Sequence, residues 1–234
     1  MNTDTISSTT PIGDIVANDF RTASVFKSNN IDFCCRGKKS LADACLERGV
    51  DPNKVKLELK ELAAIPPNAG LDYKSWKPGF LCDYIVNTHH RYVLDTLPDL
   101  MLYTRKIADV HGVHHPELIE VAALFAQINQ ELLQHLKKEE EVLFPAIKNV
   151  LANNNPESKK TIVSEIARMA GEHEFAGGAM DTINTLTHYY ALPEDSCGTY
   201  QVTFKLLEQF EDDLHIHVHL ENNILYPAAL KLAN

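Results

Sequence analysis

The chain has 234 residues, of which 44% are hydrophobic and 23% charged, and its formal net charge is −10. This composition is that of a folded globular protein and excludes a disordered chain. The acidic balance argues against nucleic acid or an anionic membrane as a partner, because both are bound through basic faces. No apolar run approaches the ~20 residues that span a bilayer, and the first residues lack the features of a signal peptide. We therefore expect a cytoplasmic protein.

Residues 1–66 are predicted to form a small helical domain. Apolar residues recur at helical spacing in three segments, Ile12–Lys27, Ser40–Gly49 and Pro52–Ala64. Ser40 and Asp51 are expected to cap the second and third helices, because short polar side chains accept hydrogen bonds from the first free amides of a helix. A stretch rich in proline and glycine follows, and residues 67–79 are predicted to be a linker.

Residues 80–234 are predicted to form an antiparallel four-helix bundle, so the fold class is all-α. Short polar breaks separate four segments with helical spacing: Phe80–Val110, Pro116–Leu151, Ser158–Tyr190 and Cys197–Leu232. Pro98 lies inside the first segment and should kink that helix or mark a restart. The sequence contains no βαβ alternation, no phosphate-binding loop and no nucleophile elbow.

The second and fourth helices repeat one another. His135–Ala146 aligns without gaps on His217–Ala228, in the shared frame His-x-x-x-Glu-x-x-x-Leu-aromatic-Pro-Ala. Positions i and i+4 lie about one turn, or ~6 Å, apart on one face of a helix. The pairs formed by His135 with Glu139 and by His217 with Glu221 can therefore point at one place in the core.

The first and third helices add one histidine each at a matching offset. His90 precedes His135 by 45 residues, and His173 precedes His217 by 44 residues. His89 competes with His90 for the first position, and the matching intervals favour His90. Two copies of one helix pair with the same offset indicate a site with approximate two-fold symmetry.

These residue types indicate the metal. Six ligands are too many for a catalytic zinc ion, and the absence of cysteine among them disfavours structural zinc. Imidazoles with carboxylates suit iron or manganese, and two carboxylates can bridge two ions. We predict a carboxylate-bridged, non-haem di-iron centre with an oxo or hydroxo bridge, held by His90, His135, Glu139, His173, His217 and Glu221.

Other polar residues near this pattern are expected to have ordinary roles. Four histidines fall at helix ends or breaks and are expected to be exposed: His111, His114, His115 and His188. His215 and His219 flank His217 and should face away from the metals. Glu131 and Glu172 lie near ligands in sequence, where each accepts a hydrogen bond from a ligand, lines a polar path to the metals or is a surface residue.

The five cysteines are an odd number, scattered along a chain too large to need disulfides, so free thiols are expected. Cys45, Cys82 and Cys197 are predicted to be packing residues. Cys34 and Cys35 are adjacent, and a disulfide between neighbours is strained because their Cα atoms lie only ~3.8 Å apart.

The chain resembles a known family in both parts. The bundle resembles a hemerythrin-like domain, and Asp32–Leu41, with its Cys34-Cys35 pair, resembles the double-cysteine signature of the repair of iron centres family. Members of that family join a short N-terminal domain to such a bundle. Arg36 stands where the family often has glycine. The six predicted ligands fall on the metal positions of the family, and Cys34 and Cys35 fall on its cysteine pair.

The resemblance implies a protein induced by nitrosative or oxidative stress that helps to restore damaged iron–sulfur clusters. Its expected partners are damaged iron–sulfur cluster proteins and a second copy of the chain. The basic residues Arg36, Lys38 and Lys39, and a helix starting near Ser40, should favour thiolate at the cysteine pair. We therefore expect Cys34 and Cys35 to be reactive, functional thiols.

Three functions remain open from the sequence. The leading hypothesis is iron donation, in which a labile iron leaves the centre for a damaged cluster and the cysteine domain guides docking or transfer. The alternative is a di-iron nitric oxide reductase, whose protection of clusters would be indirect. The third is a reversible oxygen carrier or sensor, in which the cysteine domain has no obvious use. No catalytic residue is assigned.

Overall fold

The structure, a computed structural model, describes residues 6–65 and 72–234. The described residues are almost entirely helical and form no β-strand, only an isolated bridge between Pro11 and Ser40. The chain divides into two compact units. The first unit contains the residues up to Leu81 together with His215–Leu232, and the second unit contains Cys82–Leu214. No helix in the described part of the chain is long and apolar enough to cross a membrane.

The N-terminal part of the first unit consists of short helices. They are α1 (Ile12–Asn18), the 3₁₀-helix η2 (Phe20–Thr22), α2 (Ala23–Ser28), α3 (Leu41–Glu47), α4 (Pro52–Ala64) and the 3₁₀-helix η3 (Tyr73–Ser75). The prediction of one helix over Ile12–Lys27 is wrong, because Asp19 has an extended backbone and its carboxylate accepts hydrogen bonds from Arg21. The chain therefore turns between α1 and η2.

The predicted caps of α3 and α4 are confirmed. Ser40 Oγ accepts a hydrogen bond of 3.1 Å from the backbone N–H of Asp43, and Asp51 Oδ1 accepts one of 2.9 Å from Asn53. The bounds of α4 agree with the predicted segment. Of the predicted linker, residues 67–71 lie outside the described residues. The remainder contains η3 and the start of α5 (Pro78–Ile85).

Within the first unit, α1 packs against the segment Glu221–Leu225, and its backbone closely approaches that of Gly37. Gly13 donates a backbone hydrogen bond of 2.8 Å to Gly37, and a Cβ atom on either glycine would lie within 2.4 Å of Asn223 Oδ1. Only glycine, which has no side chain, permits this approach. The Asn223 amide donates to the backbone carbonyl of Cys34 at 3.1 Å.

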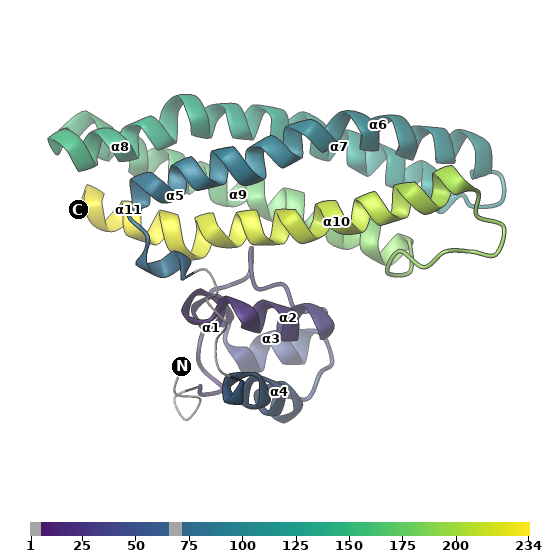
Figure 1. The fold of residues 1–234 in the computed structure, drawn as a ribbon, viewed down its shortest axis with the longest axis horizontal. Coiled ribbons are helices and arrows are strands. Elements are labelled where there is room, and N and C mark those ends of the chain that lie inside the picture. The colour runs from purple at the N-terminus through teal and green to yellow at the C-terminus, as the bar shows by residue number, and fades with distance from the viewer. Residues whose placement is uncertain (1–5, 66–71) are drawn as a thin grey trace. The chain divides into compact units, whose positions relative to one another are not determined.

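The C-terminal part of the chain forms the four-helix bundle seen in Figure 1. Its elements in chain order are α5, the π-helix η4 (Val86–His90), α6 (Arg91–His111), α7 (Glu117–Lys138), the π-helix η5 (Glu139–Leu143), α8 (Phe144–Asn153), α9 (Pro156–Leu186), α10 (Gly198–Leu220), the π-helix η6 (Glu221–Leu225) and α11 (Tyr226–Ala233). In the second unit α6 packs on α7, while α7 and α8 pack on α9. The buried rings of Phe125 and Phe210 meet edge to face at 5.4 Å and join α7 to α10.

Three of the four long helical segments contain a π-helical turn at a predicted ligand. η4 ends at His90, η5 begins at Glu139 and η6 begins at Glu221. Pro145 and Pro227 explain the last two turns, because proline has no N–H and its ring crowds the carbonyl four residues earlier. A wider π turn relieves that crowding, and such turns are frequent at functional sites. The repeated Pro-Ala of the sequence frame thus has a local structural effect.

Helix α6 runs through Pro98 without a restart, so of the two effects predicted for this proline only the kink stays a prediction. Helix α9 ends at Leu186, before the predicted Tyr190, because His188, Tyr189 and Tyr190 have positive φ angles of 49°, 61° and 59°. Residues in this left-handed conformation cannot continue a right-handed helix.

Candidate metal centre

The six predicted ligand side chains are buried in the protein. Each is at most 2% exposed, and the carboxylates of Glu139 and Glu221 are fully buried. Burying carboxylates is costly unless cations or hydrogen bonds compensate them. The burial of this polar set is therefore what a metal centre requires.

The ring nitrogens and carboxylates face one another at short distances. Glu139 Oε2 lies 3.3 Å from Nε2 of both His90 and His135, and Glu221 Oε1 lies 3.0 Å from Nε2 of His217. Nε2 of His173 lies 3.0 Å from Nε2 of His135. Two adjacent ligands on an octahedral ion, each ~2.1 Å from the metal, are separated by about 3.0 Å. The spacing fits ligands around a cation of that size.

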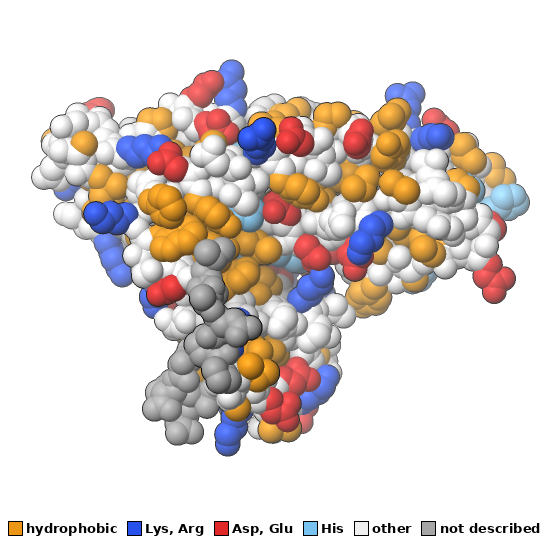
Figure 2. Space-filling model, in the orientation of Figure 1, with side chains coloured by type: hydrophobic (Ala, Val, Ile, Leu, Met, Phe, Trp, Pro, Cys, Tyr) orange, Lys and Arg blue, Asp and Glu red, His pale blue; other side chains and the backbone are white. Residues whose placement is uncertain are grey.

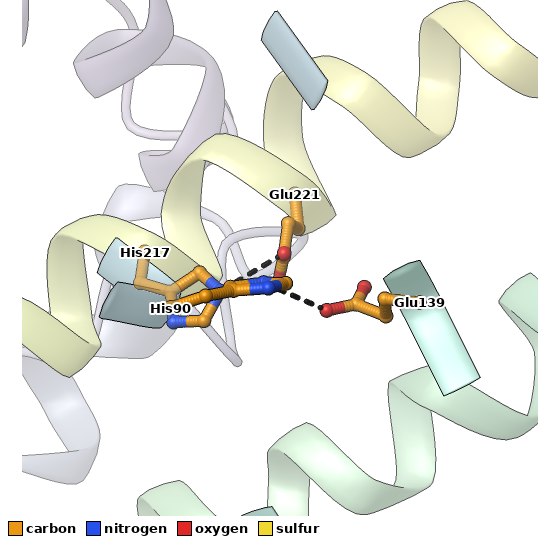
Figure 3. A group of neighbouring side chains, drawn as sticks. All are labelled: His90, Glu139, His217 and Glu221. Atoms are coloured by element: carbon orange, nitrogen blue, oxygen red, sulfur yellow. Dashed lines mark hydrogen bonds and ion pairs between the residues drawn. The ribbon is translucent and has the colours of Figure 1, made fainter. Parts of the chain in front are cut away.

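The candidate ligands fall into two groups that share both carboxylates. One group contains His90 and His217 with Glu139 and Glu221, and it is drawn in Figure 3. The other contains His135 and His173 with the same two glutamates. Within each group the potential ligand atoms all lie within 4.8 Å of one another. Each group offers two imidazoles and a share in two carboxylates.

Two of these histidines are oriented by carboxylates on their other ring nitrogen. His90 Nδ1 lies 2.8 Å from Glu140 Oε1, and His135 Nδ1 lies 2.9 Å from Glu172 Oε2. An ionised carboxylate only accepts hydrogen bonds, so Nδ1 carries the hydrogen and the Nε2 lone pair is available to a metal. The hydrogen bond from His135, together with that from Lys138, lowers the pKa of Glu172 to about 2.

The structure shows where Glu172 and Glu131 lie relative to the ligands. Glu172 is a hydrogen-bond acceptor for His135, whereas Glu131 is exposed on α7. Glu140, which accepts a hydrogen bond from His90, was not predicted from the sequence. Its position directly after Glu139 was the available signal, but only the packing of two helices brings it to His90.

His89 and His90 take different roles although they are adjacent and both buried. Nδ1 of His89 bonds Asp213 at 2.9 Å, and its ring meets Tyr84 edge to face. His89 belongs to neither candidate metal group, whereas His90 belongs to one. Neighbouring residues on a helix point about 100° apart, so only one of the two can face the centre.

Two histidines predicted to be exposed are only partly exposed, and they contact exposed polar residues in the second unit. Nε2 of His115 lies 3.0 Å from Asp195, which raises the pKa of His115, and Nε2 of His111 lies 3.2 Å from Sγ of Cys197. Cys197 is exposed rather than a packing residue. The backbone N–H of Tyr200 and the ring of His111 lower the pKa of the Cys197 thiol to about 7.

His219 is completely buried and belongs to neither candidate metal group. Its ring packs edge to face on Phe33 at 5.5 Å, and Asn223 lies 3.1 Å from its Nδ1. Burial lowers the pKa of His219 to about 4, so it is a neutral packing residue in the first unit.

The expected thiolate character of the cysteine pair is wrong for Cys34. Cys34 is only 2% exposed, and burial, the neighbouring Cys35 and the Asp32 carboxylate raise the pKa of its thiol well above the usual value. Lys39 and Arg36 lie 2.6 Å and 3.3 Å from Glu47, and Arg36 also lies 4.0 Å from the Asp32 carboxylate, so both cations are paired with acidic side chains rather than with the thiols. Neither cysteine forms a disulfide among the described residues, as predicted.

Fold and site together define a protein of the hemerythrin type. Residues 83–229 match the hemerythrin HHE cation-binding domain, and residues 8–63 match ScdA_N, a domain of unknown function (DUF542). The chain is 30% identical over 216 residues to the iron-sulfur cluster repair protein ScdA of Staphylococcus epidermidis, covering 92% of this chain and 95% of that protein. It is 34% identical over 214 residues to the iron-sulfur cluster repair protein YtfE of Musicola paradisiaca, covering 90% and 91%. The chain therefore belongs to the family of iron–sulfur cluster repair proteins that join an ScdA_N domain to a hemerythrin HHE domain.

Proposed function

We propose that this protein repairs iron–sulfur clusters damaged by oxidative or nitrosative stress, and that it does so by donating iron from a di-iron centre. The observation that carries the proposal is the sharing of Glu139 and Glu221 by two groups of histidines. Two ions held side by side need bridging ligands, and shared carboxylates supply them. The names of the relatives support the repair role.

The choice of iron follows from the ligand chemistry. Imidazole and carboxylate together suit iron, and the sulfur ligands that would favour zinc or copper are absent from both groups of described residues. Each ion would have fewer than six protein ligands, which leaves room for a solvent-derived bridge. When bound, such a centre supplies ferrous iron that can be given up, and the released ion is cargo rather than a permanent cofactor.

A surface pocket in the second unit offers a route for that cargo. It has a volume of about 250 Å³ and is lined by Val86, Asn87, His90, Arg91, Leu94, Asp95 and Glu140. The pocket therefore reaches a candidate ligand, His90, and the carboxylate that orients it. The exposed side chains of Asp95 and Glu140 give the pocket cation-attracting oxygens. We infer that the ion beside His90 is the labile one.

Damaged iron–sulfur cluster proteins are the proposed partners, in the cytoplasm. Neither nucleic acid nor membrane is proposed, and the surface supports this choice. On the face drawn in Figure 2, lysine and arginine side chains are scattered among acidic ones, and the described residues there show no continuous basic patch. Phosphate backbones and anionic lipids require such a patch.

Iron donation is tested by reactivating a cluster enzyme that has been damaged with nitric oxide. The protein is loaded with labelled iron, and both recovered activity and label in the cluster are measured under anaerobic conditions. The iron-loaded protein should restore activity and transfer label, whereas the same protein loaded with redox-inert zinc should do neither. Glu139→Leu should fail as well, and its control is Glu131→Leu, the same change at an exposed site on α7. Reactivation by the zinc-loaded protein would overturn the proposal.

Reduction of nitric oxide at the same centre predicts a different outcome. The reduced protein would then form nitrous oxide from nitric oxide in repeated turnovers without losing iron. Label would stay with the protein, and damaged clusters already present would not recover. Measuring nitrous oxide and iron transfer in one anaerobic reaction therefore separates the two functions.

A further inference from the structure

A second cluster of metal-ligating side chains lies in the first unit, apart from the histidine and glutamate residues of the centre. Asp32, Cys34 and Cys35 each present one ligand atom, and these atoms lie within 4.8 Å of one another. Cys34 is buried, while Asp32 and Cys35 are partly exposed. The cluster is thus enclosed on one side and reachable from the other.

The loop that carries these side chains is held in shape by its own hydrogen bonds. Asp32 Oδ1 accepts from the backbone N–H of Cys34 at 2.9 Å and of Cys35 at 3.0 Å, and the Cys34 thiol donates to the same oxygen at 3.0 Å. Asn223 holds the backbone carbonyl of Cys34 at 3.1 Å from the other side. The three potential ligands are therefore positioned before any ion arrives.

The distance between the two sulfur atoms matches a single metal ion. Sγ of Cys34 and Sγ of Cys35 are 3.7 Å apart. Two thiolates on a tetrahedral ion, each ~2.3 Å from it, are separated by about 3.8 Å. The same separation is far longer than the ~2.05 Å of a disulfide bond. The pair is spaced for an ion between the sulfurs.

We propose that Asp32, Cys34 and Cys35 form a second metal site, which binds one thiophilic divalent cation with two thiolates and one carboxylate and leaves a fourth position open. Soft thiolate ligands select ions such as zinc or ferrous iron over magnesium or calcium. Arg36, whose Nε lies 4.0 Å from Asp32, offsets part of the negative charge of such a site. Without metal Cys34 carries its proton, because burial and its neighbours raise its pKa. Binding of the ion by two thiolates releases the protons of both thiols to solvent.

The site is independent of iron donation, since it concerns binding by the first unit alone, and it is tested without any repair assay. The full chain is first loaded with iron, in a Cys197→Ser background that removes the exposed thiol, and is then titrated anaerobically with Co²⁺ and with Zn²⁺. Co²⁺ bound by thiolates shows a sulfur-to-cobalt charge-transfer band. One equivalent of Co²⁺ should produce that band, and Zn²⁺ should abolish it.

Three variants locate the bound ion. Cys34→Ser and Cys35→Ser should each lose the band. Asp32→Asn should bind at least tenfold more weakly while keeping the loop, because the asparagine oxygen still accepts from both backbone amides. Cys45→Ala, which removes another buried thiol of the same unit, should leave binding unchanged. The absence of a charge-transfer band in the parent chain, or its persistence in both serine variants, would overturn the proposal.

Discussion

Removing the charge of Glu172 should weaken metal binding without unfolding the protein. The carboxylate accepts from His135 Nδ1 at 2.9 Å, is bonded by Lys138 at 2.7 Å, and has a side chain that is 17% exposed. Losing such a partner of a ligating histidine costs ~10-fold to 100-fold in metal affinity. Glu172→Gln keeps an acceptor oxygen and the site is partly exposed, so we expect about tenfold, or ~1.4 kcal/mol. Glu140→Gln should cost less, since the Glu140 side chain is 39% exposed.

The assay is a competition titration of ferrous iron against a chromophoric chelator under anaerobic conditions, with the two ions fitted separately. Glu174→Gln is the matched control, because it is the same change at an exposed position two residues further along α9. Circular dichroism establishes that each variant is folded. Equal iron affinity in Glu172→Gln and the parent protein would refute the argument that this carboxylate supports the centre through His135. An equal loss in Glu174→Gln would refute it too.

Three further predictions concern other parts of the chain. Alkylation of Cys197 should rise with pH around a midpoint of about 7, as thiolate forms, and His111→Ala should move that midpoint upward; a midpoint near 9 in the parent would contradict the role of the environment. Gly13→Ala, which places a Cβ atom 2.9 Å from the backbone Cα atom of Gly37, should lower the free energy of unfolding by ~1–3 kcal/mol in urea titrations, whereas Gly178→Ala, where the added Cβ meets nothing within 4 Å, should not destabilise. Phe125→Ala in the bundle core should cost ~3–5 kcal/mol in the same titrations, and a loss below ~1 kcal/mol would show that the ring is not part of the core.

The sequence by itself determined the all-α class and the pairing of residues within each helix. Helical spacing and the i, i+4 relation are local properties, so His135 with Glu139 and His217 with Glu221 could be placed on one helix face before any coordinates were known. The caps at Ser40 and Asp51 were predictable for the same reason. The repeat also contains Pro145 and Pro227, which cause two of the π turns, although the turns themselves were not predicted.

Only the tertiary structure decided relations between distant segments. Packing places Glu140 beside His90, Glu172 beside His135 and Asp213 beside His89, and each carboxylate hydrogen-bonds a ring nitrogen of that histidine. It also reversed the expectation for Cys34. Nearby lysine and arginine residues in the sequence suggested a thiolate, but Lys39 and Arg36 pair with Glu47 and the thiol is buried beside Asp32. A pKa depends on burial and on the direction of neighbouring charges, and both are set by packing rather than by sequence distance.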